Sequence, residues 1–292
     1  MTTLAPFELH RVATVAEATG LLDDLGDEAV VYSGGTELLL LMKLGFAAYG
    51  HLVDVKHIEE MARLETDDEG ALLIGGAVSH RAVERSPLVE AGWPALAEME
   101  RMVANIRVRN VGTLGGNLAF ADPHSDPATF LLAADATVIL GRGDARRAVA
   151  MADFVLGPYT TALEPGELIV AINVPATPAG AAMAHHKFSF NERPAATVAC
   201  LVQVVDGAVA AARIAVGSVG VAPVRVPAAE ALLTGARLPL TQEVLDAAGR
   251  LSADAADPVT DGNGSADYKR ALAGTLVGRC LADAAARASG TA

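Results

Sequence analysis

Two short glycine segments constrain this chain more than any other feature. Residues 33–38 read Ser-Gly-Gly-Thr-Glu-Leu, and residues 113–118 read Thr-Leu-Gly-Gly-Asn-Leu. Glycine has no Cβ, so the backbone at these points can approach a bulky anion closely and turn its N–H groups toward it. We expect two loops in different parts of one domain that grip a single extended anionic ligand. A dinucleotide pyrophosphate fits that description.

The first segment lies between an expected strand over residues 28–32 and an expected helix over residues 36–44. The N-terminus of that helix would add N–H donors, and Thr36 can donate a hydroxyl hydrogen bond to a phosphate oxygen. Neither segment contains lysine or arginine, so binding would rest on backbone donors. Neither matches the Gly-x-Gly-x-x-Gly pattern of a Rossmann site or the P-loop pattern, which excludes those folds. The plainer interpretation is that each glycine pair forms only a tight turn.

Composition excludes several classes of protein. The formal net charge of −13 argues against a nucleic-acid-binding surface, which needs clustered lysine and arginine. The chain shows no basic segment followed by an apolar one at its start and no apolar run long enough to cross a bilayer. We therefore expect neither a secretory signal nor a transmembrane segment.

Cysteine and histidine placement argues against a metal site within the chain. Cys200 and Cys280 are far apart, which favours a reducing cytoplasm over a disulfide scaffold. Two cysteines cannot hold a two-iron cluster alone, so any such cluster would lie in another chain. His185 and His186 are adjacent on an expected strand and point to opposite faces, so they cannot chelate one metal together. Neither His-Glu-x-x-His nor Cys-x-x-Cys is present, and we expect no metal ligands.

Apolar periodicity predicts an α+β fold, in which a cofactor-binding region precedes a small sheet packed with helices. Strands are expected over residues 28–32, 52–55, 72–74, 137–140, 168–174, 185–189, 197–205 and 209–216. Helices are expected over residues 12–25, 36–44, 80–85, 94–102, 129–134, 228–234, 242–253 and 266–287. The succession of strand, loop, helix and strand over residues 28–55 indicates parallel strands with the glycine loop at their carboxyl edge. Asp206-Gly207 indicates a hairpin, and residues 175–180 indicate a linker.

Several polar residues near the second glycine segment allow two interpretations. Asp126 either bonds hydroxyl groups of a ligand or caps the helix that follows it. His124 is a loop histidine with no serine or cysteine nucleophile beside it, so we interpret it as solvated rather than catalytic. Arg107 and Arg109 would share one face if residues 106–110 are extended. There they would form either a solvated edge or a contact with an anion or a partner.

The chain also carries a series of motifs in a fixed order. They cover residues 33–38, residues 106–118 (Ile-Arg-Val-Arg-Asn-Val-Gly-Thr-Leu-Gly-Gly-Asn-Leu), 121–127 (Ala-Asp-Pro-His-Ser-Asp-Pro), 159–163, 216–220 with 223–225, and 267–270 (Asp-Tyr-Lys-Arg). Together they resemble the FAD-binding medium subunit of the molybdenum hydroxylases, such as carbon monoxide dehydrogenase and xanthine dehydrogenase.

The resemblance covers nearly the whole chain and implies a fold. That fold is the FAD-binding type of vanillyl-alcohol oxidase (PCMH type), here over residues 1–178, with subdomains of about residues 1–56 and 57–178. A C-terminal medium-subunit domain would follow over residues 179–292, with a three-stranded antiparallel sheet and a helical bundle.

The resemblance also implies a set of FAD-binding positions and no catalytic residue. The two glycine segments would hold the pyrophosphate and ribityl of FAD, and Asp126 would contact its hydroxyl groups. Val103 would lie near the flavin, and Lys187 and residues 193–198 would pass beside the isoalloxazine ring. The full set is Val31, Tyr32, Ser33, Gly34, Gly35, Thr36, Glu37, Leu38, Val103, Thr113, Gly115, Gly116, Asn117, Asp126 and Lys187.

Four residues depart from the family pattern. Many relatives carry an aspartate at the position of Thr197 and a bulky residue at that of Val198. His124 and Ser125 replace the small residues usual in the loop after the second glycine segment. The contacts on the flavin faces and the shape of that loop are therefore where this chain differs from the family.

Partners follow from the same resemblance. In that family a large molybdopterin subunit hydroxylates the substrate, and electrons pass through the [2Fe-2S] clusters of a small subunit to FAD. The chain would join both subunits in a dimer of heterotrimers, with the molybdenum cofactor and the clusters outside it. NAD, a quinone or oxygen would accept the electrons, and the complex would be cytoplasmic or held at the inner face of the membrane. Because flavin chemistry belongs to the cofactor, this chain would position and tune it.

Two other functions are compatible with the sequence. A free-standing flavoprotein oxidoreductase of the same fold would need substrate-binding residues and a proton donor beside the flavin, and no clear candidate is visible. A non-catalytic assembly subunit that has lost FAD would not need intact glycine segments. Bound flavin would colour the purified protein, which separates this last function from the other two.

Replacing Gly35 or Gly116 with valine is expected to abolish FAD binding, because a branched side chain would block close approach of the pyrophosphate. The flavin absorbance of each purified variant measures the cofactor that it retains. Stoichiometric FAD in both variants would contradict the assignment of these segments.

Overall fold

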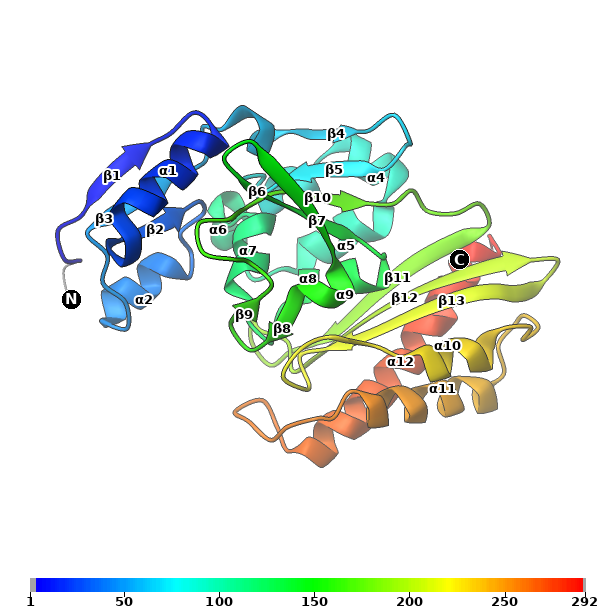
Figure 1. Ribbon diagram of the computed structural model, residues 1–292. Helices are drawn as coiled ribbons and strands as arrows, with labels where there is room; N and C mark the ends of the chain where they lie inside the picture. The colour runs from blue at the N-terminus through cyan, green and yellow to red at the C-terminus, as the bar shows by residue number, and fades with distance from the viewer. Residues whose placement is uncertain (1–3, 291–292) are drawn as a thin grey trace.

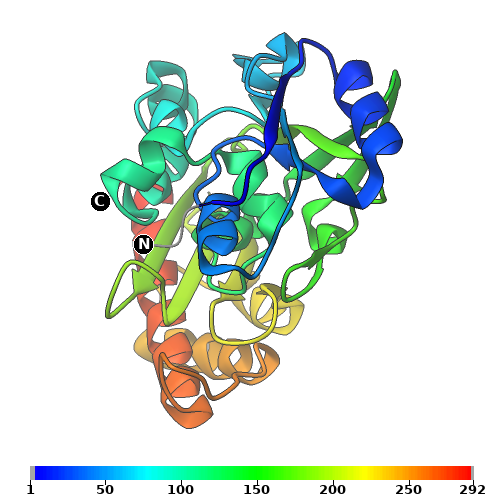
Figure 2. The ribbon, with the colours of Figure 1, turned by 90° about the vertical axis from the view of Figure 1, so that its left-hand side faces the viewer.

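The computed structural model describes residues 4–290, in which three larger sheets follow one another along the chain and a two-stranded sheet of β8 and β9 lies within the stretch that forms the second (Figure 1). Figure 1 shows the first sheet and the C-terminal helices at opposite ends of the molecule, and Figure 2 shows the molecule with the first sheet toward the viewer. Across these residues, every helix is too short or too polar to cross a membrane.

The first sheet is parallel and has the strand order β1-β3-β2. Its elements are β1 (Glu8–Arg11), α1 (Val15–Leu25), η1 (Gly26–Glu28), β2 (Ala29–Tyr32), α2 (Leu38–Leu44) and β3 (His51–Asp54). Val15 and Ala18 of α1 pack in one core with Val53 of the central strand. The parallel pairing of β2 with β3 confirms the expectation from the sequence. β1 gives no such signal, because its residues are largely exposed.

The second sheet is antiparallel and has the strand order β4-β5-β10-β6-β7. Its strands are β4 (Leu64–Thr66), β5 (Leu72–Gly75), β6 (Thr137–Arg142), β7 (Ala145–Ala150) and β10 (Leu168–Val174). The helices are α3 (His80–Glu84), α4 (Pro87–Gly92), α5 (Pro94–Met102), α6 (Ile106–Val111), α7 (Leu114–Phe120) and α8 (Asp126–Ala133). Shorter elements are η2 (Glu59–Ala62), α9 (Met151–Phe154), β8 (Val155–Gly157) and β9 (Thr160–Thr161).

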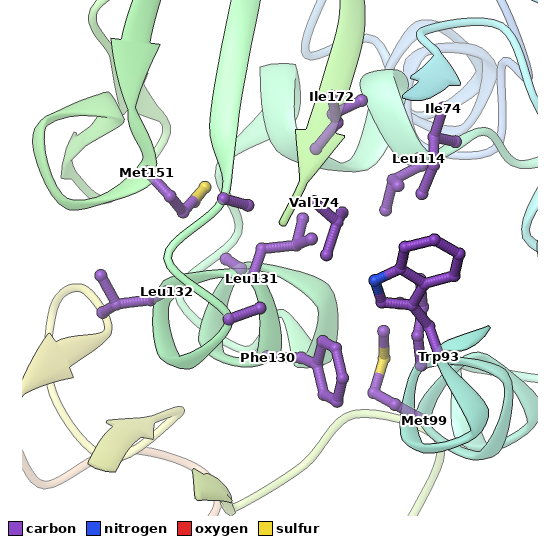
Figure 3. Close-up of a cluster of buried hydrophobic side chains, with 14 of the residues drawn as sticks. Ile74, Trp93, Met99, Leu114, Phe130, Leu131, Leu132, Met151, Ile172 and Val174 are labelled. Carbon is purple, nitrogen blue, oxygen red and sulfur yellow. The ribbon is translucent and has the colours of Figure 1, made fainter. Parts of the chain in front are cut away.

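Helix α8 is buried along its whole length and lies in the core of this part of the molecule. Figure 3 shows Phe130 and Leu131 of α8 in the same cluster as Ile172 of β10 and Trp93. Burial of each such side chain contributes about 1.5–3 kcal/mol. The indole N–H of Trp93 donates to the carbonyl oxygen of Pro175 at 2.9 Å, so the one polar atom of this ring is satisfied.

The third sheet is antiparallel and has the strand order β11-β12-β13-β14. Its elements are β11 (Ala181–Phe188), β12 (Ala196–Val205), β13 (Ala208–Gly217), β14 (Val224–Arg225), α10 (Pro227–Leu233), α11 (Gln242–Ala255) and α12 (Ala266–Ala288). The three expected strands are present, and β14 adds a short fourth. Asp206 and Gly207 both have positive φ, as a tight hairpin requires. Cys200 and Cys280 are free and buried in the core between the sheet and the helices.

The third sheet also contributes to the core around α8. Ala199, Leu201 and Ala215 belong to the same cluster of buried residues as Phe130. The strands of this sheet are therefore covered on both faces, by α8 on one and by α11 and α12 on the other. One continuous core joins the second and third sheets.

The segment of residues 106–110 is helical and not extended. Asn105 caps α6, because its side chain accepts hydrogen bonds from two backbone N–H groups of the first turn. This local cap outweighs the preference of the branched apolar residues for a strand. Arg107 and Arg109 consequently do not share one face: Arg107 is exposed, whereas Arg109 Nε donates to Glu84 Oε2 at 3.0 Å.

The second glycine segment forms the first turn of α7 and not a loop. Thr113 caps this helix, and its Oγ1 accepts from the N–H of Gly116 at 3.1 Å. A Cβ on Gly115 would overlap the carbonyl oxygen of Gly76 and lie 2.7 Å from its Cα. Glycine at this position therefore allows α7 to pack against the backbone that follows β5.

Candidate functional site

The first loop, which joins β2 to α2 over residues 33–37, presents a series of unpaired backbone N–H groups. Within residues 4–290, no hydrogen bond uses the N–H of Gly34, Gly35, Thr36 or Glu37. Gly35 has a φ of 68°, in the left-handed region, which bends the loop. Successive N–H groups around such a residue form a concave site for an anion. The Thr36 hydroxyl also has no hydrogen-bond partner among the described residues, so it is a further available donor.

This loop lies directly against the start of α7. Ser33 Oγ and Thr113 Oγ1 are 3.1 Å apart and form a hydrogen bond. A Cβ on Gly34 would overlap the carbonyl oxygen of Val111 and lie 2.6 Å from the Cα of Gly112. Only a residue without a side chain permits this approach. The structure thus brings the two glycine segments together, although they are far apart in the sequence.

Lys56 holds the beginning of the first loop. Its Nζ donates to the carbonyl oxygen of Ser33 at 3.2 Å and to Asp54 Oδ1 at 2.6 Å. The same ammonium lies 3.9 Å from the ring centroid of Tyr32, a cation–π contact. A Cβ on Gly35 would overlap this ring, so a valine there is opposed by both the Tyr32 ring and the positive φ.

Asp126 is not the cap of α8. Ser125 is the cap, since its side chain accepts from the backbone of the first turn. The Ser125 hydroxyl in turn donates to Asn117 Oδ1 at 2.7 Å, which ties α7 to α8. The interpretation of Asp126 as a helix cap is therefore wrong, and the interpretation as a ligand contact stays a prediction.

Asp126 instead forms a buried ion pair with Lys187 of β11. Lys187 Nζ donates to Asp126 Oδ2 at 2.8 Å and to the carbonyl oxygen of Met102 at 2.6 Å. Among the described residues Asp126 Oδ1 has no hydrogen-bond partner, and it lies 3.7 Å from His185 Nε2. Val103 directly follows Met102 and is buried. The pair thus connects β11 of the third sheet to α8 and to the end of α5, beside Val103.

Burial determines the protonation of this cluster. It raises the pKa of Asp126 above its ordinary value, even though the charge of Lys187 acts in the opposite direction. Burial, followed by the charges of Lys187 and His186, lowers the pKa of His185 to about 3. His185 is therefore neutral at pH 7, and its Nε2 shares a 2.7 Å hydrogen bond with Thr197 Oγ1. The charge opposite Asp126 is that of Lys187.

Arg193 joins the first loop to the segment between α7 and α8. Its Nη2 lies 3.2 Å from Glu37 Oε1, and its Nη1 lies 2.9 Å from Asp122 Oδ2. Asn105 Nδ2 donates to the neighbouring Glu192 at 2.7 Å. The Arg193 side chain is about half exposed, so each of its ion pairs contributes at most about 1 kcal/mol. Glu37 and Arg193 are 156 positions apart, and no sequence signal indicates their pairing.

His124 is partly buried and paired, so its interpretation as a solvated residue is wrong. Its Nδ1 lies 2.9 Å from the carbonyl oxygen of Pro194, and its Nε2 lies 3.3 Å from Asp261 Oδ2. Asp261 also accepts from the fully buried Lys269 at 2.6 Å. These contacts attach the segment after α7 to the C-terminal part of the chain.

Two family models match the chain. Residues 5–177 match the FAD binding domain in molybdopterin dehydrogenase, and residues 187–284 match the CO dehydrogenase flavoprotein C-terminal domain. The chain belongs to the FAD-binding medium subunits of the molybdenum hydroxylases. The resemblance seen in the sequence is thereby confirmed. This medium subunit is an FAD-binding component of an oxidoreductase.

Relatives of known sequence and structure cover this medium subunit almost completely. The carbon monoxide dehydrogenase medium chain of Hydrogenophaga pseudoflava is 36% identical over 96% of this chain and 98% of its own. The carbon monoxide dehydrogenase medium chain of Afipia carboxidovorans is 32% identical over 97% of this chain and 98% of its own. A solved carbon monoxide dehydrogenase from Hydrogenophaga pseudoflava, which lacks the Mo-pyranopterin moiety, matches with a TM-score of 0.92 and 36% identity, over 98% of this chain and 99% of that one. The expected fold class is confirmed.

The residues present fit FAD. The loop of Gly34 and Gly35 offers only N–H and hydroxyl donors and is shaped by glycine, which suits the oxygens of a pyrophosphate. The buried pair of Asp126 and Lys187 places a fixed charge of each sign beside Val103.

Replacing Lys187 with methionine is expected to lower the free energy of unfolding by about 3–5 kcal/mol at pH 7, because Asp126 is left buried without its cation. A folded-state pKa raised above the unfolded value of about 3.9 gives stability that is present below that value and is lost as the pH rises. Removal of Lys187 takes away the charge that lowers the pKa of Asp126, so the deficit of Lys187→Met should shrink as the pH falls below 7. Urea unfolding of the FAD-free protein measures both effects.

The double variant Asp126→Asn with Lys187→Met is the matched control. It removes both charges together, so it should recover most of the stability at pH 7. Wild-type stability of the single variant at pH 7 would show that Asp126 does not depend on Lys187.

Proposed function

We propose that this medium subunit relays electrons from the [2Fe-2S] clusters of a small partner subunit, through its FAD, to an external acceptor. The observation that carries the proposal is the anion site of unpaired N–H groups in the first loop, held against Thr113 of the second glycine segment. A large molybdopterin subunit would complete a heterotrimer, two of which would form a dimer. The acceptor would be NAD, a quinone or oxygen, and the complex would be cytoplasmic or held at the inner face of the membrane.

The proposed binding residues divide by the part of FAD that they would hold. The first loop and the start of α7 would hold the pyrophosphate and ribityl. Asp126 would contact hydroxyl groups, and Val103 and Lys187 would lie near the flavin. Residues 1–178 would form the FAD-binding domain, with subdomains of about residues 1–56 and 57–178, and residues 179–292 the C-terminal domain. The proposal rests on family membership and on the proximity of these residues in the structure.

The chain's own residues would bind and orient the cofactor, which when bound supplies the transfer of one or two electrons. The N–H groups of the first loop would fix the phosphates without using a side-chain cation. Lys187 is held at 2.6 Å from the carbonyl oxygen of Met102 and cannot swing freely, so its charge stays in one place. His185 is neutral at pH 7 and adds no second positive charge. No nucleophile or general base is required of this chain.

The Thr36 hydroxyl offers a test of the phosphate position that preserves the backbone. Thr36→Val keeps the shape of the side chain and removes the donor, so FAD binding should weaken by about ten- to a hundredfold, the effect of one hydrogen bond to a charged group. Thr36→Ser keeps the hydroxyl and should bind FAD nearly as the wild type does. Fluorescence titration of the FAD-free protein measures both affinities. Equal affinity of all three proteins would place the phosphates elsewhere.

Co-expression with the subunits encoded beside it is expected to yield a complex that contains two unlike partners. Native mass measurement gives its composition. Anaerobic addition of a substrate that the molybdenum subunit oxidises should decrease the flavin absorbance of the complex, whereas the isolated medium subunit with the same substrate should keep oxidised flavin. A stable medium subunit that turns over substrate alone would contradict the relay and favour a free-standing flavoenzyme.

A further inference from the structure

A cluster of two histidines and a carboxylate lies on the first sheet, outside the FAD site. Glu8 and His10 are on β1, and His51 begins β3. In the parallel register Glu8 pairs with His51. Residues i and i+2 of a strand point to the same face, so Glu8 and His10 share the face of their neighbour His51. The backbone register itself therefore brings the three side chains together.

The three side chains have the spacing of metal ligands. One ligand atom from each residue lies within 4.8 Å of the other two. His10 Nε2 and His51 Nδ1 are 2.9 Å apart, and His51 Nδ1 lies 3.8 Å from Glu8 Oε2. Bonds of about 2.0–2.2 Å to a tetrahedral zinc ion set its ligands about 3.4 Å apart. The observed separations fall on both sides of this value, so small side-chain rotations would meet it.

The surroundings of the cluster suit a cation with an open coordination position. The two imidazoles are partly buried, with side-chain exposures of 20% and 27%, whereas Glu8 is 68% exposed. Three protein ligands with a solvent-facing side leave room for water as a fourth.

We propose that Glu8, His10 and His51 form a binding site for a divalent transition-metal ion of the zinc type. Imidazole and carboxylate ligands suit zinc, cobalt and nickel. β1 is an edge strand of four residues, and it pairs only with β3 in its sheet. A metal shared between β1 and β3 would clamp this strand onto the sheet, because an ion that binds only the folded state stabilises it. The site is independent of the FAD-binding proposal.

Zinc titration of the full-length protein, prepared without a histidine tag, tests this proposal. We expect one Zn²⁺ per chain by competition with a colorimetric chelator, and a rise in Tm when zinc is added. Glu8→Gln and His10→Gln each remove one ligand and should weaken binding by about tenfold or more. His57→Gln is the matched control, because His57 is an exposed histidine that follows β3 and lies outside the cluster.

The hydrogen bond between the two imidazoles is the competing explanation of this geometry. It predicts that wild type, Glu8→Gln and His10→Gln bind zinc equally weakly, a result that would overturn the proposal. Equal weakening by His57→Gln would overturn it too, since the binding would then be spread over surface histidines. Circular dichroism and flavin content of each variant establish that the fold is retained.

Discussion

The backbone contact between the first loop and the end of α6 determines how the candidate site is built. Gly34 meets Val111 and Gly112 so closely that no side chain fits between them. This contact joins a parallel sheet to an antiparallel one, and neither sheet alone provides both glycine segments. The anion that we propose for the free N–H groups of the loop would therefore lie at a junction, where movement of either sheet would alter the site.

The third sheet is anchored to α8 and to the end of α5 by a largely buried ion pair. Lys187 connects β11 to α8 through Asp126 and to the end of α5 through a carbonyl oxygen. A buried pair of this kind is weak support for stability in general, because both ions lose their hydration. Its geometric effect is clearer, since the ammonium has two fixed acceptors and the carboxylate has one fixed donor. His124 and Asp261 add a second connection between the same parts of the chain.

Much of the fold could be predicted from apolar periodicity, and the exceptions have local physical causes. β10 and α5 have the same bounds as expected from the sequence, because long apolar runs and a leading proline define them. α6 was not predicted as a helix, because the side-chain cap from Asn105 favours a helix over the extended conformation that its branched residues prefer. The cap of α8 is Ser125 and not Asp126, and the Ser125 hydroxyl also bonds Asn117, a contact that the sequence does not indicate. Periodicity also says nothing about β1, whose pairing with β3 creates the histidine cluster.

The candidate site was predictable only in part, for a different reason. Residue chemistry alone indicated an extended anion, and the ordered motifs were needed to indicate FAD. The glycine pairs were singled out as an anion site, which stays a prediction, and the structure gives Gly34 and Gly115 a further role in packing backbone against backbone that depends on partners distant in sequence. Arg193 could not be predicted from the sequence for the same reason. Its two ion-pair partners, Glu37 and Asp122, are brought close to it only by the fold.

The shared core around α8 also limits how this chain can change. Ala199, Leu201 and Ala215 of the third sheet pack with Phe130 of α8, which lies on the other side of the linker. A cut near residue 178 would expose apolar surface on both fragments, so neither half is a self-sufficient module. A chimera that joins the first half of one relative to the second half of another must match the side chains on both sides of this core. A substitution in this core on one side of the linker is therefore expected to be tolerated only together with a matching substitution on the other side.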